Sequence, residues 1–186
     1  GDVGRHAVAA ALEFPPTVVR QVRALSTNIK ALEKRQWKCG CEGQHSVTES
    51  DRLQLIQADC TTANLDQYME GVSAVISCLG NRRPFHDDCV AKLGTQRVVQ
   101  AILRQEVTPR FVMLSSVGIA EDWPPMEWSR EGQRLEGFFR TICWMQYQDL
   151  SGAELAIQQG AQTNEEFNFL IVRCVILDET TLPVGG

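Results

Sequence analysis

The sequence has no apolar run long enough to cross a bilayer and no excess of basic residues. Its 186 residues include 18 Lys and Arg against 23 Asp and Glu, which gives a formal net charge of −5. The composition therefore gives no support to nucleic-acid binding through a general basic surface, and no transmembrane segment is predicted. The length suits one domain with a substantial core, and the 44% of hydrophobic residues is ordinary for a globular protein.

Disulfide and metal signals are also scarce. The seven cysteines are an odd set without the spacing of a small disulfide scaffold, so we expect mostly reduced thiols. Reduced thiols argue against secretion and leave the cytosol, the mitochondrial matrix and the chloroplast stroma open. Cys39 and Cys41 with His45 supply only three donors, which do not complete a tetrahedral zinc shell, and no metal site is predicted.

What the chain does contain is a regular alternation of strand and helix patterns. The alternation predicts one α/β domain over residues 1–186, a Rossmann-like doubly wound parallel sheet with its first strand absent from this chain. We expect a polar insertion at 38–51 and a Pro- and Trp-rich loop at 119–130. The predicted strands are 17–25, 53–57, 73–79, 110–115 and 167–173, and the predicted helices are 3–13, 29–37, 65–70, 90–104, 131–144 and 151–159.

Two further patterns shape these expectations. The strand at 73–79 is a near-continuous apolar run, as expected when both faces of a parallel sheet are covered. In the helix at 90–104, apolar residues at helical spacing predict a buried stripe, and Asp87 is a plausible cap before it. The residues of that stripe are Val90, Leu93, Val98, Ala101 and Ile102.

The chain begins with Gly1-Asp2-Val3-Gly4-Arg5, which runs straight into an apolar helix. Glycines before a helix allow a backbone to approach a pyrophosphate, whose charge the helix N-terminus then favours. Such a turn should follow a buried strand, which in the order 3-2-1-4-5-6 lies in the middle of the sheet. We therefore expect the natural chain to extend upstream of Gly1, or another segment to fill that place.

Taken in order, these motifs resemble the atypical short-chain dehydrogenase/reductases, in particular their NAD(P)-binding, NmrA-like branch. Gly1–Arg5 looks like the tail of the family's glycine turn, and 71–77 is similar to its Gly-Val-Asp-Ala-Val-Ile strand. Further similarities lie at 22–25, 57–59, 110–116, 153–154 and 170–173.

The resemblance implies a dinucleotide across the carboxyl ends of the strands, with its pyrophosphate near Gly1–Arg5. Asp59 would lie near the adenine, or else it caps the turn after its strand; both readings stay open. The cofactor-binding residues implied are Gly1, Val3, Gly4, Arg5, Ser26, Thr27, Asn28, Lys30, Asp59, Cys60, Ser77, Cys78, Leu79, Gly80 and Ser115.

The choice between NAD and NADP depends on the end of the second strand of the family's fold. NAD-binding proteins usually place a carboxylate there for the ribose hydroxyl, and NADP-binding proteins place an arginine. This chain has Ser26-Thr27-Asn28 with Lys30 close by. No carboxylate is present to repel a 2′-phosphate, although the usual arginine is missing too, and the residues favour NADP.

The reductase chemistry of the superfamily requires a tyrosine, a lysine four residues later and a serine that orients the carbonyl. The candidate catalytic residues are Ser116 and Tyr147. The position four after Tyr147 is Ser151, which cannot supply a fixed positive charge, and no lysine follows Lys92. Alternatively, Tyr147 is an ordinary helix residue.

Two functions from different classes follow. The first is a non-catalytic NAD(P)-binding accessory, assembly or redox-sensing subunit of a larger complex, in which Trp123, Trp128 and Trp144 either anchor a protein partner or cover the core. The second is an NADP-dependent oxidoreductase or isomerase with an unusual active site. A remnant that binds no nucleotide is a third reading.

Overall fold

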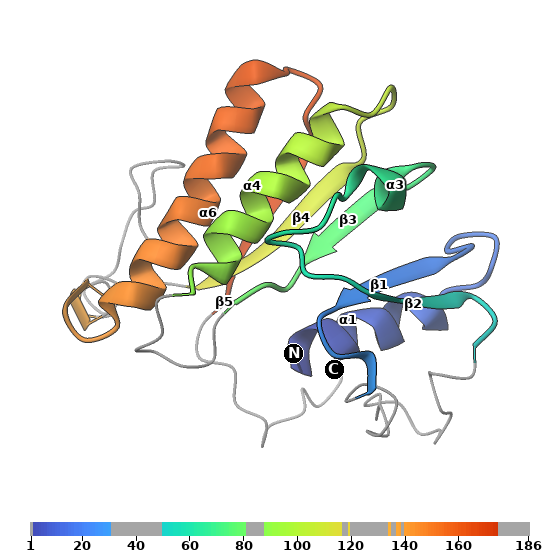
Figure 1. Cartoon of the computed structure of the whole chain (residues 1–186), viewed down its shortest axis with the longest axis horizontal. Coiled ribbons are helices and arrows are strands. Elements are labelled where there is room, and N and C mark those ends of the chain that lie inside the picture. Colours follow the sequence, from blue (N-terminus) through green and yellow to red (C-terminus); the bar gives the residue numbers. More distant parts are fainter. Residues whose placement is uncertain are drawn as a thin grey trace, which may run out of the picture. The chain divides into compact units, whose positions relative to one another are not determined.

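The structure is a computed structural model that describes residues 2–30, 50–80, 88–116, 119, 134, 137–138 and 140–174 (Figure 1). The chain divides into two compact units, one formed by residues 1–63 and 178–186 and the other by residues 64–177. Most of the predicted insertion at 38–51 and of the loop at 119–130 lies outside the described residues, as does Asp87. The single-domain organisation stays a prediction.

The N-terminal unit combines one helix with two parallel strands. Its elements are α1 (Asp2–Glu13), β1 (Val22–Ser26) and β2 (Leu53–Gln57), with Val22 opposite Leu53. The helix and β2 agree with the sequence prediction. The strand predicted from residue 17 begins only at Val22, because the carbonyl of Pro15 accepts hydrogen bonds from the amides of Val18 and Val19 and holds this stretch in a turn.

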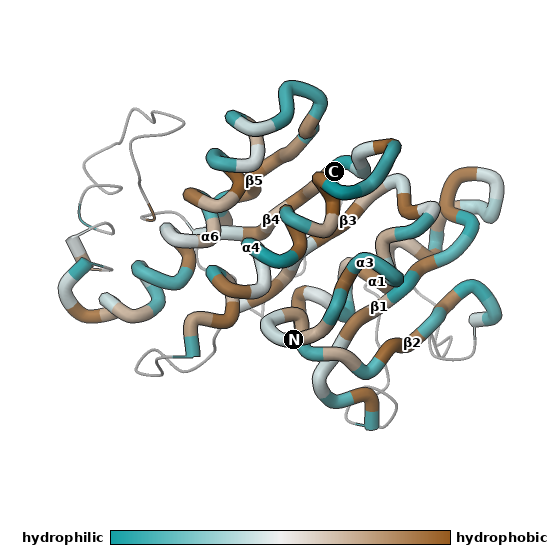
Figure 2. Tube along the Cα trace, turned by 45° about the horizontal axis from the view of Figure 1, so that its top comes forward, coloured by the Kyte–Doolittle hydropathy of each residue, from teal (hydrophilic) through white to brown (hydrophobic). Residues whose placement is uncertain are grey.

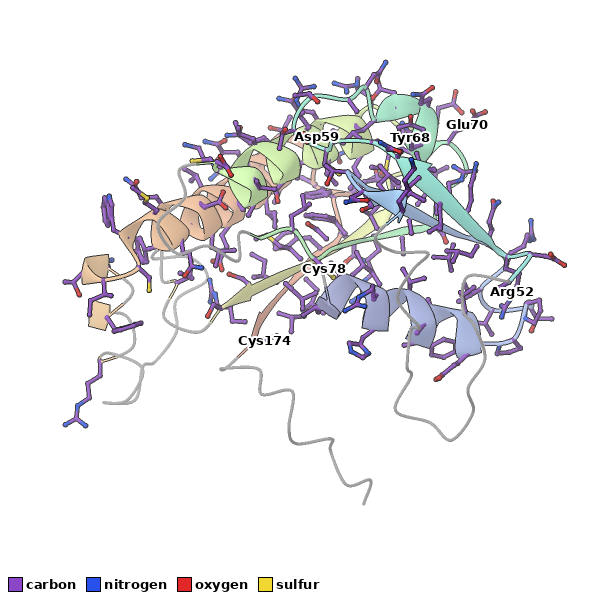
Figure 3. All side chains as sticks on the ribbon, turned by 60° about the horizontal axis from the view of Figure 1, so that its bottom comes forward. Arg52, Asp59, Tyr68, Glu70, Cys78 and Cys174 are labelled. Atoms are coloured by element: carbon purple, nitrogen blue, oxygen red, sulfur yellow. The ribbon has the colours of Figure 1, made fainter. Side chains whose placement is uncertain are left out.

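One arginine joins the end of α1 to the start of β2. The guanidinium of Arg52, labelled in Figure 3, donates to the carbonyls of Phe14 and Val19 at 2.9 Å each and also to the carbonyl of Leu12. The last carbonyls of a helix have no partner within the helix. Arg52 supplies donors to this end of α1 from 40 residues away in sequence.

The larger unit is a three-stranded parallel sheet with helices on one side. Its strands lie in the order β3–β4–β5, and Figure 1 shows α4 and α6 side by side over one face of this sheet. The order of these strands and the β1–β2 pair are consistent with a Rossmann-like fold, so the predicted α/β class is confirmed. The elements are α3 (Asp66–Met69), β3 (Ala74–Ser77), α4 (Val90–Leu103), β4 (Arg110–Ser116), α6 (Trp144–Thr163) and β5 (Phe169–Cys174).

The core of this unit lies between the sheet and the two helices. Figure 2 shows apolar residues along β3, β4 and β5. Alternate residues of β4 are buried, and the Phe111 ring stacks on Phe167 with centroids 6.3 Å apart. The two helices approach closely where Gly160 lies against Val99, since a Cβ built on Gly160 would stand 2.6 Å from a Val99 methyl carbon.

The opposite face of the sheet is less covered than the sequence predicts. The apolar run at 73–79 predicts burial on both faces, yet Ile76 is 52% exposed and Leu170 is 45% exposed. Ser77, the neighbour of Ile76, is buried, so β3 has one covered and one open face.

Two helix predictions need correction. The segments predicted at 131–144 and 151–159 imply a break between them, but α6 runs without interruption from Trp144 to Thr163. In α4 the predicted stripe is buried at Val98, Ala101 and Ile102, whereas Leu93 is 43% exposed because it faces away from the sheet and α6. Among the described residues, no helix has both the length and the apolarity needed to cross a bilayer.

Candidate functional site

In the N-terminal unit, the ends of β1 and β2 bring two groups of predicted cofactor residues together. Ser26 pairs with Gln57, and the amide of Ala58 donates to the carbonyl of Ser26 at 3.0 Å. The turn at Ser26–Asn28 and the turn that begins at Asp59 therefore lie side by side at the carboxyl edge of the strand pair. This edge is where ligands bind in open parallel sheets.

The first of these turns carries polar groups and no acid. The amide of Asn28 donates to the Ser26 hydroxyl oxygen at 3.2 Å, which shapes the turn. Thr27, Asn28 and Lys30 are exposed, and no carboxylate occurs from residue 22 to residue 30. These groups offer hydrogen-bond donors and one positive charge.

The carboxylate of Asp59 caps the turn that follows β2. Its Oδ1 accepts from the Thr61 amide at 2.8 Å and from the Thr61 hydroxyl at 2.7 Å. These hydrogen bonds, first that from the hydroxyl, lower the pKa of Asp59 below its ordinary value. The turn-capping interpretation of Asp59 is thus confirmed, and its contact with an adenine stays a prediction.

The next residue, Cys60, is partly buried. Burial and the nearby Asp59 charge raise the pKa of its thiol, so it is a poor nucleophile at neutral pH.

The glycine segment forms the first turn of α1. Asp2 is already helical, Val3 is exposed, and Gly4 and Arg5 are partly buried. Gly1 lies outside the described residues. The contact of this segment with a pyrophosphate stays a prediction, and α1 supplies the helix N-terminus that it requires.

In the larger unit, the end of β3 carries the next group of predicted residues. Ser77 is 6% exposed, and its hydroxyl oxygen has no hydrogen-bond partner among the described residues. Its neighbour Cys78, labelled in Figure 3, is partly buried, and burial raises the pKa of this thiol. An unpaired buried hydroxyl at a carboxyl edge is what a site for a polar ligand would contain. Leu79 and Gly80 continue this edge.

The end of β4 holds a buried polar cluster. The Ser115 hydroxyl donates to Glu154 Oε1 at 2.6 Å, and Glu154 pairs with Arg173, whose Nη2 lies 2.5 Å from Oε2. Ser115, Glu154 and Arg173 come from β4, α6 and β5. The contact to α6 places Ser115 on the helix side of the sheet, and strand alternation places Ser116 on the other side.

Tyr147 lies near the start of α6 and is 5% exposed. Its ring stacks on Trp144 with centroids 6.1 Å apart, and the Arg140 guanidinium carbon lies 5.3 Å from the ring centroid. One turn further on, Ser151 is buried and its hydroxyl donates to the Gln148 carbonyl at 3.4 Å. The position where the resemblance implies a lysine therefore holds a buried neutral hydroxyl. Pairing of Ser116 with Tyr147 stays a prediction.

A lysine from another helix does reach α6. The stem of Lys92 crosses Gly152, because a Cβ built on Gly152 would stand 2.7 Å from Lys92 Cδ. Asp149 holds this end of α4 in place through its carboxylate, which accepts from the amides of Ala91 at 3.1 Å and Lys92 at 2.7 Å. The sequence did not identify this cap.

A comparison with family models shows to which family the chain belongs. A family model described as NAD(P)H-binding matches residues 1–183. The chain belongs to this NAD(P)H-binding family. A search of curated proteins found no match. A nicotinamide dinucleotide is therefore the cofactor. Among the described residues no group of three or more His, Cys, Asp or Glu could hold a metal ion; Cys39, Cys41 and His45 lie outside these residues.

Proposed function

We propose that this protein binds NADP(H) as a non-catalytic accessory, assembly or redox-sensing subunit, and that within its family it is of the NmrA-like short-chain dehydrogenase/reductase type. The observation that supports the non-catalytic role most directly is Ser151, a buried neutral hydroxyl four residues after Tyr147. In such reductases the lysine at this place lowers the tyrosine pKa and holds the nicotinamide ribose. A serine that is hydrogen-bonded to its own helix can do neither.

The surroundings of Ser115 support the same conclusion. Its hydroxyl hydrogen is donated to Glu154, so Ser115 has no hydrogen with which to polarise a substrate carbonyl. Ser116 lies on the face of β4 opposite α6, away from the helix that carries Tyr147.

The preference for NADP rests on the turn after β1. Lys30 and the exposed groups of Thr27 and Asn28 offer a positive charge and donors, and no carboxylate occurs from residue 22 to residue 30. A 2′-phosphate would gain charge-assisted hydrogen bonds there.

Binding and turnover measured on the same preparation test the proposal. NADPH fluorescence should change on binding, while a panel of aldehydes, ketones and enones should give no cofactor oxidation above the rate without protein. Binding with turnover would overturn the non-catalytic role, and absence of binding would overturn the cofactor assignment.

The second candidate function is an NADP-dependent oxidoreductase or isomerase. One observation favours it: the stem of Lys92 crosses α6 at Gly152, directly beside Ser151. A lysine supplied by α4 would then take the place of the one that α6 lacks. If turnover is found, Lys92→Met should abolish it, and Arg110→Met, at the exposed amino end of β4, should leave it unchanged.

A further inference from the structure

The last residue of β2 is a glutamine that the predicted cofactor residues do not include. Gln57 is exposed, and its carboxamide makes no hydrogen bond among the residues that the structure describes. A carboxamide carries two N–H donors and one oxygen acceptor. The side chain of Gln57 therefore offers both kinds of group to a ligand at the carboxyl edge of the β1–β2 pair.

The strand register places Gln57 beside Ser26, the last residue of β1. The two residues are Cα partners in the parallel pair, and the pairing continues to the edge, where the amide of Ala58 donates to the carbonyl of Ser26 at 3.0 Å. Neighbouring strands lie about 4.8 Å apart, and paired residues project from the same face of a sheet. The carboxamide of Gln57 thus stands next to the first residue of the turn at 26–28.

The two turns at this edge differ in charge. The segment 22–30 holds no carboxylate and ends in the exposed Lys30, whereas the turn after β2 begins with Asp59. The Oδ1 atom of Asp59 accepts from both the amide and the hydroxyl of Thr61. Gln57 precedes this acid by two residues and is itself neutral. The residue at position 57 therefore determines whether the β1 side of the edge meets a donor or a second negative charge.

We propose that Gln57 is a specificity-determining residue whose carboxamide N–H groups donate to the 2′-phosphate of NADP(H). The inference rests on the proposed function, in which that phosphate lies at the turn after β1. An ionised phosphate accepts hydrogen bonds, and a carboxamide supplies donors there. A glutamate at position 57 would only accept and would repel the phosphate, whereas it could accept from the 2′-hydroxyl of NAD(H).

The test is calorimetric titration of the full chain with NADPH and with NADH, and the quantity compared is the dissociation constant for NADH divided by that for NADPH. This ratio should fall about threefold or more in Gln57→Ala, the size expected for one lost hydrogen bond, and about tenfold or more in Gln57→Glu, where repulsion is added. The matched control is Gln54→Glu, which puts the same charge on an exposed residue of the other face of β2. Three residues span about 10 Å along a strand, which exceeds the screening length of about 8 Å at about 0.15 M salt. At that salt concentration Gln54→Glu should keep the wild-type ratio within about twofold.

The outcomes separate the inference from the proposed function. If the wild type prefers NADPH and the ratio is unchanged in Gln57→Ala, the hydrogen bond from Gln57 is overturned and the proposed function stands. An equal fall in Gln54→Glu and Gln57→Glu would likewise overturn the local role of Gln57. A wild type that binds neither cofactor, or that binds NADH more tightly, would overturn the proposed function itself. Because each result is a ratio measured on one variant, a general loss of stability does not imitate it, and thermal unfolding confirms that each variant is folded.

Discussion

Replacing Glu154 by glutamine keeps the size of the side chain and removes its charge. The guanidinium of Arg173, 8% exposed, would then lose the carboxylate charge with which it pairs. Removing one partner of a buried ion pair costs about 3–5 kcal/mol. For a chain of 186 residues, where 1 kcal/mol shifts Tm by about 2–4 °C, Glu154→Gln should lower Tm by roughly 6–20 °C.

Thermal unfolding followed by circular dichroism measures this shift. Glu106→Gln is the matched control, because Glu106 is exposed and the same charge is lost. The double variant Glu154→Leu with Arg173→Met should be less destabilised than Glu154→Gln, since it removes both charges together. A Tm for Glu154→Gln within about 2 °C of the Glu106→Gln value would refute the buried-pair account.

Three further predictions concern the fold and the N-terminal unit. Gly160→Ala should destabilise the protein by about 1–2 kcal/mol, because its Cβ would meet Val99 at 2.6 Å. Gly152→Ala should be neutral or stabilising by up to about 1 kcal/mol, because its Cβ meets only the flexible Lys92 side chain. Chemical denaturation compares the two variants, and equal effects would contradict the close approach at Gly160. Arg52→Met should cost about 1–3 kcal/mol by the same measurement, since the carbonyls at the end of α1 lose their charged donor; an unchanged midpoint would show that Arg52 does not hold this end. The pKa of Asp59, measured by NMR, should lie below the usual ~3.9 and rise towards it in Thr61→Val. The capping interaction is thus present above about pH 4 and is lost as the pH falls through the pKa of Asp59 in the folded protein. If the pKa of Asp59 does not rise in Thr61→Val, the hydrogen bonds from Thr61 are not what lowers it.

Local patterns predicted the type of nearly every described element. The reason is that the spacing of apolar residues, and the glycines and prolines that end helices and strands, act on only a few neighbouring residues. The strand at 53–57 matches β2 residue for residue. The strand predicted to begin at residue 17 shows the limit of this reasoning. β-branched residues there favour a strand, but the Pro15 carbonyl accepts hydrogen bonds from two following amides and forms a turn. The continuity of α6 through 145–150, which the prediction left outside both helices, likewise depends on α4, far away in sequence, since Asp149 accepts hydrogen bonds from the amides of Ala91 and Lys92.

For the candidate site, the sequence could indicate strand ends that carry polar residues, but not the contacts between those residues. The family resemblance indicated Ser115 and Tyr147, and the strand ends carry the polar groups that it implies. The hydrogen bond between Ser115 and Glu154 depends on three elements meeting, so no local pattern could reveal it. The sequence nevertheless contained a signal. Glu154 lies between apolar residues on one face of a helix and Arg173 lies at the end of an apolar strand, and two opposite charges that are both buried are expected to pair.

The most direct test of NADP(H) binding is calorimetric titration of the full chain with NADPH and, separately, with NADH. We predict that NADPH binds more tightly, that Lys30→Ala weakens NADPH and leaves NADH unchanged, and that Gly4→Leu abolishes binding of both. Tighter binding of NADH would contradict the NADP preference drawn from the turn after β1. Binding of neither cofactor would contradict the central claim and leave a Rossmann-like scaffold used for its surface alone.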